Sequence, residues 1–400
     1  MKFQIKVGEL LTAVNNVSFT IDKKGTEGSG GILVKACKSE TDACILLYTT
    51  LHKAETVIKH PATVTVPGQA LLYPKQLRAG LLNRNPEDVA EISRVEKKDQ
   101  PTRIQVKIGK SVFHMADNPA GLEEMIKRMQ DIPFRQTEAY TMKGKELAEF
   151  VRRVSLCVPE EDEGTQQFEL GGMRLLCGED GFEAQATDGH ACARIIIKGE
   201  KGPQNMNSIL LPRLALPALS KLVNKEDAVK VIEGPKNARN DLVKLFFKIG
   251  ENTFFGSRLL LGAFPAIVSV LRTHAPDFWF KVDKVALKQI LDRAPAFDTE
   301  HLLIKLQVVG DVLRVITKST NADITDEVPI EREEGMPADL NISITTNLQY
   351  VRDVASCSSL EKLRIGMSDY NVKAKAAKAL IVDDAHDEID ATYAIMPVRS

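Results

Sequence analysis

Hydrophobic residues recur at helical spacing in some stretches of the chain and at alternate positions in others. In Lys143–Ser155, one face of a 3.6-residue helix carries Leu147, Phe150, Val151 and Val154. The stretches TVTVPG and RIQVKIG alternate apolar with polar residues, as half-buried strands do, and Gly, Asn and Pro turns separate them. The pattern predicts amphipathic helices combined with antiparallel strands, which is the α+β class.

The predicted elements repeat along the chain. KVGELLTAVNNVS from Lys6 aligns with KGKELAEFVRRVS from Lys143, and a looser copy, KVDKVALKQILDRA, begins at Lys281. Successive copies are offset by about 137 residues, which divides the chain into thirds. A second helix is predicted in each third, within VPGQALLYPKQLRAGLL, LPRLALPALSKLV and TNLQYVRDVASC. We therefore predict three domains, 1–136, 137–275 and 276–400, each with two helices packed on antiparallel sheets.

A third repeated element contains the most conspicuous polar group. The strand-like ILLYTTLHKAETVIK resembles FEAQATDGHACARIII, so that Thr49 corresponds to Thr187 and His52 to His190. LRVITKSTNADITDEVPI holds the same place in the last third. Asp188 and His190 either belong to a catalytic or metal-binding group or are polar residues at a bend in a strand.

An enzyme is disfavoured by three observations. The other histidines lack metal-ligand spacing such as HxxxH, and the chain has no GxSxG or phosphate-loop signature. In the repeat, His190 is matched by His52, whereas Asp188 is replaced by Thr50. The sequence therefore predicts no catalytic residues, no metal and no cofactor, with an enzyme using Asp188 and His190 kept as an alternative.

Composition narrows the class of protein further. The chain has 400 residues, 27% of them charged, and a net charge of −1, so any affinity for nucleic acid must come from local segregation of charge. The six cysteines are scattered without a CxxC pair, which indicates buried reduced thiols. No signal peptide or membrane span is predicted, and we expect a cytoplasmic protein.

Basic residues recur on the polar faces of the predicted helices. They can be ordinary solvated side chains, or together they can form a surface that contacts phosphates without reading base sequence. Their recurrence on equivalent helices favours the second interpretation. The first helix is an exception, because its exposed Thr12, Asn15 and Asn16 are uncharged. The candidate DNA-facing residues on the helices are Lys75, Arg78, Lys145, Arg152, Arg153, Arg213, Lys221, Lys284, Lys288 and Arg352.

The chain resembles the bacterial β sliding clamp, the processivity factor of the replicative DNA polymerase. The resemblance rests on the MKF start, the threefold repeat, ATDGH, the LPR at Leu211–Arg213, the GxFP turn at Gly262–Pro265 and the ending YAIMPVRS. It implies the DNA clamp fold, with three domains per chain and two chains closing head to tail into a homodimeric ring. It further implies a non-catalytic accessory subunit that encircles double-stranded DNA without sequence specificity. A clamp-like scaffold that binds proteins without DNA is the other alternative.

The resemblance also implies partners and a site for them. Polymerase subunits and the clamp loader bind the family through short peptide motifs, in a pocket between the second and third domains. The corresponding positions here are Leu170, Thr187, Gly189, His190, Ala191, Cys192, Pro265, Ser269, Val270, Asn347, Tyr350, Met396, Pro397, Val398 and Arg399. Apolar walls with a few polar groups suit a peptide groove.

The chain departs from the family at several of these positions. The family usually has Arg and Leu where this chain has Ala191 and Cys192, a basic residue is frequent at Ser269, and Leu is common at Ser400. These changes remove positive charge and bulk from the site. We expect a divergent clamp, either the main clamp or a specialised second copy, with its own preference among partner peptides.

Ring closure and two loops complete the expectations. Family interface positions fall on Phe113 and Met115 of the strand SVFHM, and on Ala296 and Phe297 across the joint. Phe113 can equally be ordinary strand core. Lys23, Lys24 and Gln167 match family loops near DNA, and can equally be solvated turns.

Overall fold

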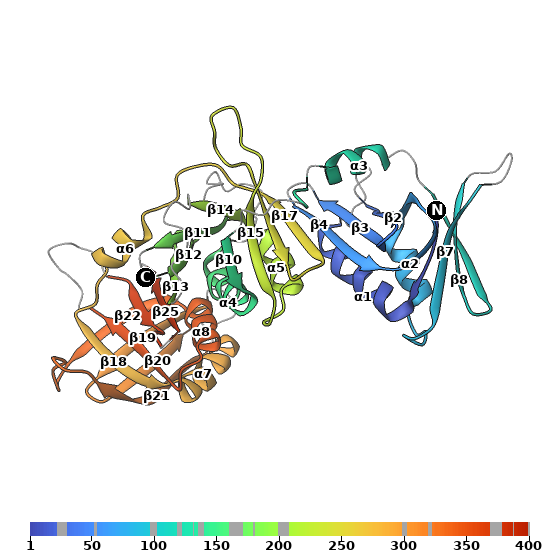
Figure 1. Cartoon of the computed structure of the whole chain (residues 1–400). Helices are drawn as coiled ribbons and strands as arrows, with labels where there is room; N and C mark the ends of the chain where they lie inside the picture. Colours follow the sequence, from blue (N-terminus) through green and yellow to red (C-terminus); the bar gives the residue numbers. More distant parts are fainter. Residues whose placement is uncertain are drawn as a thin grey trace. The chain divides into compact units, whose positions relative to one another are not determined.

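The computed structural model of the chain describes residues 1–21, 30–51, 54–96, 102–117, 122–130, 132–134, 140–159, 171–178, 181–198, 208–297, 302–318, 322–368, 378–386 and 388–398. These residues form two compact units, coloured along the sequence in Figure 1. The first unit comprises Met1–Ala148 and Leu214–Leu259, and the second comprises Glu149–Arg213 and Leu260–Ser400.

The first unit contains a five-stranded and an eight-stranded antiparallel sheet. The smaller sheet has the order β5-β1-β7-β8-β9, from β5 (Thr63–Val66), β1 (Lys2–Lys6), β7 (Val89–Val95), β8 (Arg103–Ile108) and β9 (Ser111–Ala116). The larger sheet has the order β10-β15-β16-β17-β4-β3-β2-β6, from β10 (Tyr140–Lys143), β15 (Ala228–Glu233), β16 (Lys244–Ile249), β17 (Thr253–Arg258), β4 (Ala54–Pro61), β3 (Ala43–Leu51), β2 (Ile32–Lys38) and β6 (Gly68–Leu72).

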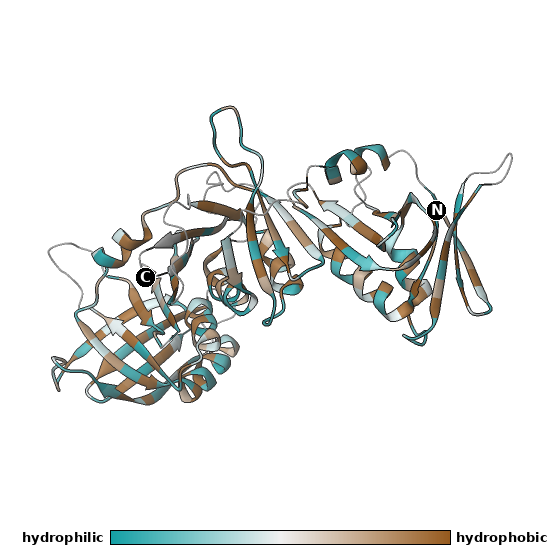
Figure 2. Ribbon diagram, in the orientation of Figure 1, coloured by the Kyte–Doolittle hydropathy of each residue, from teal (hydrophilic) through white to brown (hydrophobic). Residues whose placement is uncertain are grey.

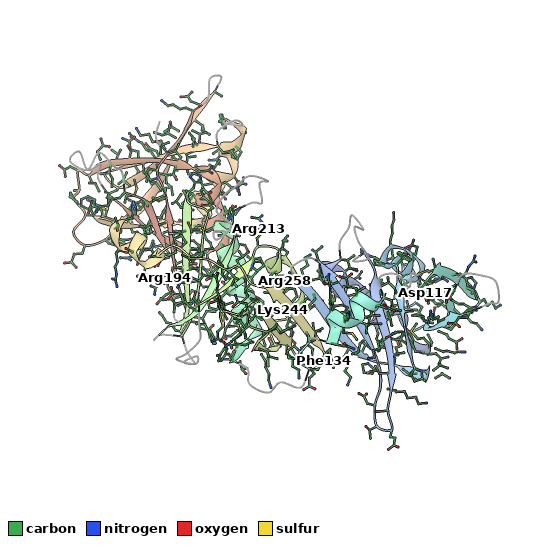
Figure 3. The ribbon with its side chains drawn as sticks, turned by 90° about the horizontal axis from the view of Figure 1, so that it is seen from above. Asp117, Phe134, Arg194, Arg213, Lys244 and Arg258 are labelled. Carbon is green, nitrogen blue, oxygen red and sulfur yellow. The ribbon has the colours of Figure 1, made fainter. Side chains whose placement is uncertain are left out.

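Helices cover both faces of the larger sheet in the first unit. α1 (Val7–Val17), followed by the short η1 (Ser18–Thr20), and α2 (Pro74–Leu81) pack on one face, and α3 (Leu122–Gln130) packs on the other (Figure 1). Alternate residues of β2 explain how this is possible, because Ile32 and Val34 join the α1 core while Leu33 joins the α3 core. Phe134, labelled in Figure 3, extends the α3 core by packing edge-on against Phe254, with ring centroids 5.1 Å apart.

A salt bridge ties β16 to β4 within the same sheet. Nζ of Lys244 lies 2.5 Å from a carboxylate oxygen of Glu55, whose other oxygen accepts a hydrogen bond from the Tyr48 hydroxyl at 2.9 Å. Burial is the main cause that raises the pKa of Tyr48, followed by the adjacent Glu55 carboxylate. The pair therefore satisfies polar groups that the sheet buries.

Of the helices in the second third, α5 (Ala215–Leu222) belongs to the first unit, and α4 (Gly144–Val154) contains the division between the units at Ala148 and Glu149. The second unit contains a twelve-stranded sheet. Its order is β14-β11-β12-β13-β25-β24-β23-β18-β21-β20-β19-β22. The strands are β14 (Ile209–Pro212), β11 (Gly172–Gly178), β12 (Gly181–Thr187), β13 (Ala191–Lys198), β25 (Ile389–Ile395), β24 (Leu380–Asp383), β23 (Lys362–Met367), β18 (Phe278–Asp283), β21 (Asp323–Arg332), β20 (Val312–Lys318), β19 (Leu303–Val309) and β22 (Asn341–Asn347).

Helices α7 (Lys284–Arg293) and α8 (Leu348–Cys357) pack against each other in the second unit, and α6 (Ile267–Thr273) packs on β13. Two short 3₁₀ turns, η4 (Ser155–Cys157) and η6 (Ala294–Ala296), follow α4 and α7. Strands β19 to β21 alternate buried with exposed positions, and Figure 2 shows the corresponding alternation of hydropathy. Asp283 caps α7 by accepting a hydrogen bond from the backbone N–H of Ala286 at 2.8 Å.

The predicted α+β class and the repeated helices agree with the structure. The helix predicted over Lys6–Ser18 is α1, and those predicted from Lys143, after Asp283 and within TNLQYVRDVASC are α4, α7 and α8. The compact units do not follow the predicted thirds, because β17 of the second third pairs with β4, and β25 of the last third pairs with β13. The boundaries 1–136, 137–275 and 276–400 therefore stay a prediction.

Candidate functional site

The Asp–Gly–His group forms the turn of a β-hairpin rather than a bend within one strand. β12 and β13 pair directly, with Thr187 opposite Cys192. One carboxylate oxygen of Asp188 accepts hydrogen bonds from the backbone N–H groups of His190 and Ala191, both at 2.8 Å. Gly189 has φ +87°, a left-handed conformation that glycine adopts without strain. Asp188 is therefore a turn-forming residue.

The second oxygen of Asp188 accepts a hydrogen bond from the Tyr350 hydroxyl of α8. Burial is the main cause that raises the pKa of Tyr350, and the Asp188 carboxylate adds to it. This bond joins the β12–β13 turn to α8, on which the predicted pocket residue Tyr350 lies. Among the residues that the structure describes, no group of three or more His, Cys, Asp and Glu side chains is placed to hold a metal ion.

The pairing of β13 with β25 brings together residues that are about 200 positions apart in the sequence. Ala191 lies opposite Ile395 and Cys192 opposite Ala394. Beyond the ladder, the backbone N–H of Met396 donates to the carbonyl of His190 at 2.8 Å. We call the predicted pocket residues that the structure describes the candidate peptide site, which comprises Thr187, Gly189, His190, Ala191, Cys192, Pro265, Ser269, Val270, Asn347, Tyr350, Met396, Pro397 and Val398.

An apolar cluster underlies the candidate peptide site. Cys192 and Ala394 are buried in it with Ile267 of α6, and the half-buried side chains packed against them include Phe264, Val270, Leu271, Trp279 and Met396. Burial raises the pKa of the Cys192 thiol to about 11, so it is a protonated apolar group at neutral pH. The floor at Ala191 and Cys192 is therefore small, uncharged and buried.

The polar residues of the candidate peptide site lie around this cluster. His190 and Ser269 are exposed, and Pro265 is half-buried. Asn347 caps α8 by accepting a hydrogen bond from the backbone N–H of Gln349 at 2.7 Å. Val398 donates its N–H to the carbonyl of Thr345 at 2.9 Å, which fixes the segment that includes Pro397. Leu170 and Arg399 lie outside the described residues.

Several predicted DNA-facing residues are exposed on helices. Lys75 and Arg78 on α2, Lys145 on α4 and Lys221 on α5 are exposed, and Nζ of Lys221 lies 5.5 Å from the Phe19 ring centroid. Others are engaged within the fold. Lys284 donates to the Ser358 carbonyl, Lys288 pairs with Asp292, and Arg352 donates to the Gln349 amide oxygen. Lys23, Lys24 and Gln167 lie outside the described residues.

Arg153 is not DNA-facing, and that prediction was wrong. Its side chain is 0% exposed and forms a salt bridge with Asp384, which is also fully buried, and a second with Glu149. Burial is the largest single cause and lowers the pKa of Arg153, but the hydrogen bond and opposite charge of Asp384, together with Tyr393, outweigh it, and the pKa lies above its usual value. Residue 153 lies beside the apolar face of α4, so the helix turns it toward the core instead of toward solvent.

Arg152, the neighbouring prediction, is exposed but also has a structural partner. Its Nη1 donates to the carbonyl of Cys357 at 2.7 Å, and its guanidinium pairs with Glu149. The side chain is 43% exposed and can still present charge to a ligand. Substituting Arg152 would therefore change packing as well as surface charge.

Arg213 is likewise a structural residue. It precedes α5 instead of lying on it, and its Nη1 donates to the carbonyls of Val158 and Pro159 at 2.7 and 2.6 Å (labelled in Figure 3). The prediction that Arg213 lies on a helix was wrong, because α5 begins at Ala215.

Of the predicted dimer residues, Met115 was wrongly assigned to the interface. It is 4% exposed and belongs to the α1 core of its own unit. Phe113 is half-buried, and a Cβ on Gly80 would meet its ring at 2.2 Å, so Phe113 packs directly over that glycine. Ala296 is exposed and Phe297 half-buried just after α7.

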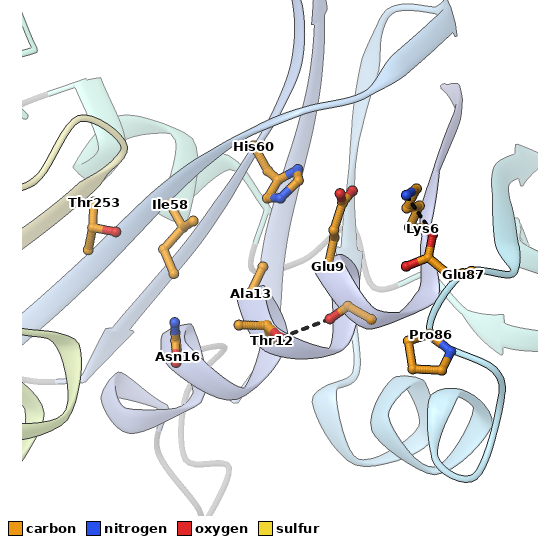
Figure 4. Close-up of a pocket in the computed structure, with 11 residues that line it drawn as sticks. Lys6, Glu9, Thr12, Ala13, Asn16, Ile58, His60, Pro86, Glu87 and Thr253 are labelled. Carbon is orange, nitrogen blue, oxygen red and sulfur yellow. Dashed lines mark hydrogen bonds and ion pairs between the residues drawn. The ribbon is translucent and has the colours of Figure 1, made fainter. Parts of the chain in front are cut away.

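A separate pocket of about 370 Å³ lies against α1 (Figure 4). Its lining includes Thr12 and Asn16, which were predicted to be exposed and uncharged, together with His60 and the acidic Glu9. Nζ of Lys6 lies 2.6 Å from the carboxylate of Glu87 at its edge. The sequence did not predict this pocket, because its residues come from β1, α1, β4, β17 and the loop that contains Pro86 and Glu87.

Comparison with known proteins gives a consistent result. Residues 141–266 match the family model of the DNA polymerase III beta subunit, central domain. The chain is 24% identical over 410 residues to the beta sliding clamp of Vibrio cholerae, with all of both chains covered, and 24% identical over 341 residues to that of Pseudomonas putida, covering 85% of this chain and 82% of that protein. Its structure is similar to that of the DNA polymerase sliding clamp of Pseudomonas aeruginosa, with a TM-score of 0.81, 22% identity and full coverage of both chains.

Proposed function

We propose that this chain, a divergent member of the β sliding clamp family, encircles double-stranded DNA and tethers the replicative polymerase and other DNA-processing proteins to it. The observation that carries the proposal is the match of the whole chain, in sequence and in fold, to sliding clamps. Holding on DNA is topological, so weak phosphate contacts suffice and tight ones would slow sliding. The role is that of a non-catalytic accessory subunit in the cytoplasm.

The candidate peptide site supports the tethering part of the proposal. An apolar cluster bordered by exposed His190 and Ser269 suits an extended peptide with one or two large apolar side chains. Polymerase subunits and a clamp loader are the proposed peptide donors. Because Ala191 and Cys192 are small and buried, we propose that the preferred peptides differ from those of relatives that carry Arg and Leu there.

One edge strand and one partly unpaired strand support closure into a homodimeric ring. Within the chain, β4 pairs with β17 and β13 with β25, each time joining successive thirds. β9 holds the place of β17 and β25 in the first third and is the last strand of its sheet. β21 holds the place of β4 and β13, and its residues 323–329 pair only with β20 among the described strands. Pairing of β9 with β21 of a second copy would repeat the same joint.

The test uses topology. The chain is loaded by its host's clamp loader onto a nicked circular plasmid, and the complex is isolated by gel filtration. We expect the clamp to remain on circular DNA and to be lost once a restriction enzyme linearises the plasmid, because a ring slides off free ends. A chain that never associates with the circle, while still binding peptides, would instead be a protein scaffold.

A charge-reversal variant tests the basic helix faces. We expect Lys75→Glu, Lys145→Glu and Lys221→Glu together to reduce the amount of clamp loaded onto the circle by about tenfold at moderate salt, since each reversed contact weakens the phosphate binding that precedes ring closure. The matched control reverses three exposed strand lysines, Lys107, Lys230 and Lys305, and therefore makes the same change in net charge. Equal losses in the two variants would contradict a role for the helix faces.

A further inference from the structure

Two cysteines that are seven residues apart in the sequence face each other in the first unit. Cys37 of β2 and Cys44 of β3 are direct partners in the antiparallel register. Both are free thiols, and Cys37 is half-buried whereas Cys44 is 6% exposed. Along the described strands, this is the one place where the register sets a cysteine opposite another.

The hairpin geometry places the two residues at a disulfide-compatible distance. The backbone N–H of Ser39 donates to the carbonyl of Asp42 at 2.8 Å, next to the turn. Ser39 and Asp42 are thus a hydrogen-bonded pair. Hydrogen-bonded and non-hydrogen-bonded pairs alternate along an antiparallel ladder, so Lys38–Ala43 is a non-hydrogen-bonded pair and Cys37–Cys44 is again a hydrogen-bonded one. Cα atoms in pairs of this kind are about 5.5 Å apart, within the range of about 5.5–6 Å most common in disulfides. Their Cβ atoms lie about 5.5 Å apart, so the two strands must approach by about 1 Å to reach the Cβ separation of a disulfide.

The surroundings make one thiol accessible and protect the other. Burial is the main cause that raises the pKa of Cys44, and the Asp42 carboxylate and the contact with the Cys37 thiol add to it. Asp42 itself pairs with Lys59 at 2.6 Å. Cys37 is therefore the thiol that a small reagent reaches first, and Cys44 is held protonated behind it.

We propose that Cys37 and Cys44 are a modification site, a thiol pair that peroxide converts reversibly into a cross-strand disulfide. The Cys37 thiolate attacks one peroxide oxygen, the O–O bond breaks, and Cys37 becomes a sulfenic acid. The Cys44 sulfur then attacks the sulfenic sulfur, forming the S–S bond and releasing water. Two thiols are oxidised, and one peroxide is reduced to two water molecules. A dithiol reductant reverses the reaction by exchange.

The test is peptide mapping of the full-length chain after mild treatment with hydrogen peroxide. Trypsin cleaves after Lys35, Lys38 and Lys53, which places Cys37 in Ala36–Lys38 and Cys44 in Ser39–Lys53. We expect the two peptides to appear joined, with the loss of two of the six thiols, and to separate after reduction with dithiothreitol.

Single substitutions provide the controls. Cys37→Ser and Cys44→Ser should each abolish the joined peptide, whereas Cys192→Ser and Cys357→Ser should retain it because those thiols are buried elsewhere. The proposal is overturned if Cys37 accumulates as sulfinic acid without the joined peptide, or if the joined peptide comes only from covalent dimers. Peptide mapping of the wild-type chain is enough to accept or reject the proposal, so the test does not depend on any variant folding.

Discussion

At the scale of single residues, the sequence left Asp188 and His190 open between a catalytic or metal-binding group and a bend in a strand, and it misassigned one buried arginine. The structure has a hairpin turn there, which the Thr187 hydroxyl and the Asp188 carboxylate fix by accepting hydrogen bonds from the backbone N–H groups of Gly189 and His190. Arg153 could not be recognised, because its partner Asp384 lies 231 residues away and no local pattern marks the pair. Met115 was misassigned for a similar reason, since a strand residue next to a sheet edge can still point into the core.

The Arg153–Asp384 pair gives a stability prediction. Asp384→Ala leaves a buried guanidinium without its main partner, and we expect a loss of about 3–5 kcal/mol in the free energy of unfolding of the second unit. Urea unfolding followed by fluorescence of Trp279, the single tryptophan, measures that unit.

An exposed pair serves as the control for this prediction. Asp292→Ala removes the partner of Lys288, where both side chains are more than 40% exposed, and should cost at most about 1 kcal/mol. Replacing both buried charges, as in Arg153→Met with Asp384→Leu, should restore most of the stability. Similar losses for Asp384→Ala and Asp292→Ala would show that the buried pair contributes no more than a surface one.

At the scale of elements, the repeated helices and hairpins were predictable, whereas α3 and α6 were missed. Both are short and lie in connections between thirds, so neither has a counterpart in the aligned repeat. α3 is amphipathic, with Leu122, Met125 and Met129 buried, and its spacing was a usable signal. α6 buries Ile267 alone among its residues, which is too little for a periodic pattern.

His274, directly after α6, gives a prediction on pH. Its Nδ1 accepts the backbone N–H of Ala379 at 3.0 Å, and burial, followed by Lys378, lowers its pKa below 6.5. As the pH falls, His274 is therefore protonated at a higher pH in the unfolded state than in the folded state. The stability contributed is complete above about pH 6.5 and declines as the pH falls below it.

The measurement is the melting temperature of the second unit, followed by Trp279 fluorescence, at about pH 7.5 and about pH 5.5. We expect His274→Asn to be less stable at the higher pH and to lose less on acidification than the wild type. His190→Asn, at an exposed histidine, should keep the wild-type acid response. An unchanged response in His274→Asn would exclude this histidine as its source.

At the scale of the whole molecule, the threefold repeat was visible in the sequence but the two compact units were not. The repeat reveals which segments are alike, whereas the units depend on which strands pair, and pairing between β13 and β25 is invisible to self-comparison. The same pairing rule leads to the proposed ring, because among the described strands it leaves β9 and residues 323–329 of β21 with a partner on one side alone.

A proline in β9 tests that ring. Ile108 and Ser111 flank the two-residue β8–β9 turn and form a hydrogen-bonded pair. Because such pairs alternate with non-hydrogen-bonded ones, His114 and its partner Gln105 form a non-hydrogen-bonded pair, and the N–H of His114 points away from β8. His114→Pro should therefore block pairing with a second copy while sparing the β8 ladder, and convert a dimer into a monomer of 44.2 kDa. Light scattering after gel filtration measures the mass. His114→Ala keeps the N–H and should stay dimeric; a dimeric His114→Pro would rule out this joint.

The burial of Arg153 against Asp384 also constrains how this gene can change over generations. Either residue alone can be replaced only at a cost comparable to much of a domain's stability. Descendants should therefore keep both residues or exchange both together, and lineages with only one of them should be rare. Substitutions at positions 153 and 384 should thus be correlated, although the two positions are far apart in the sequence.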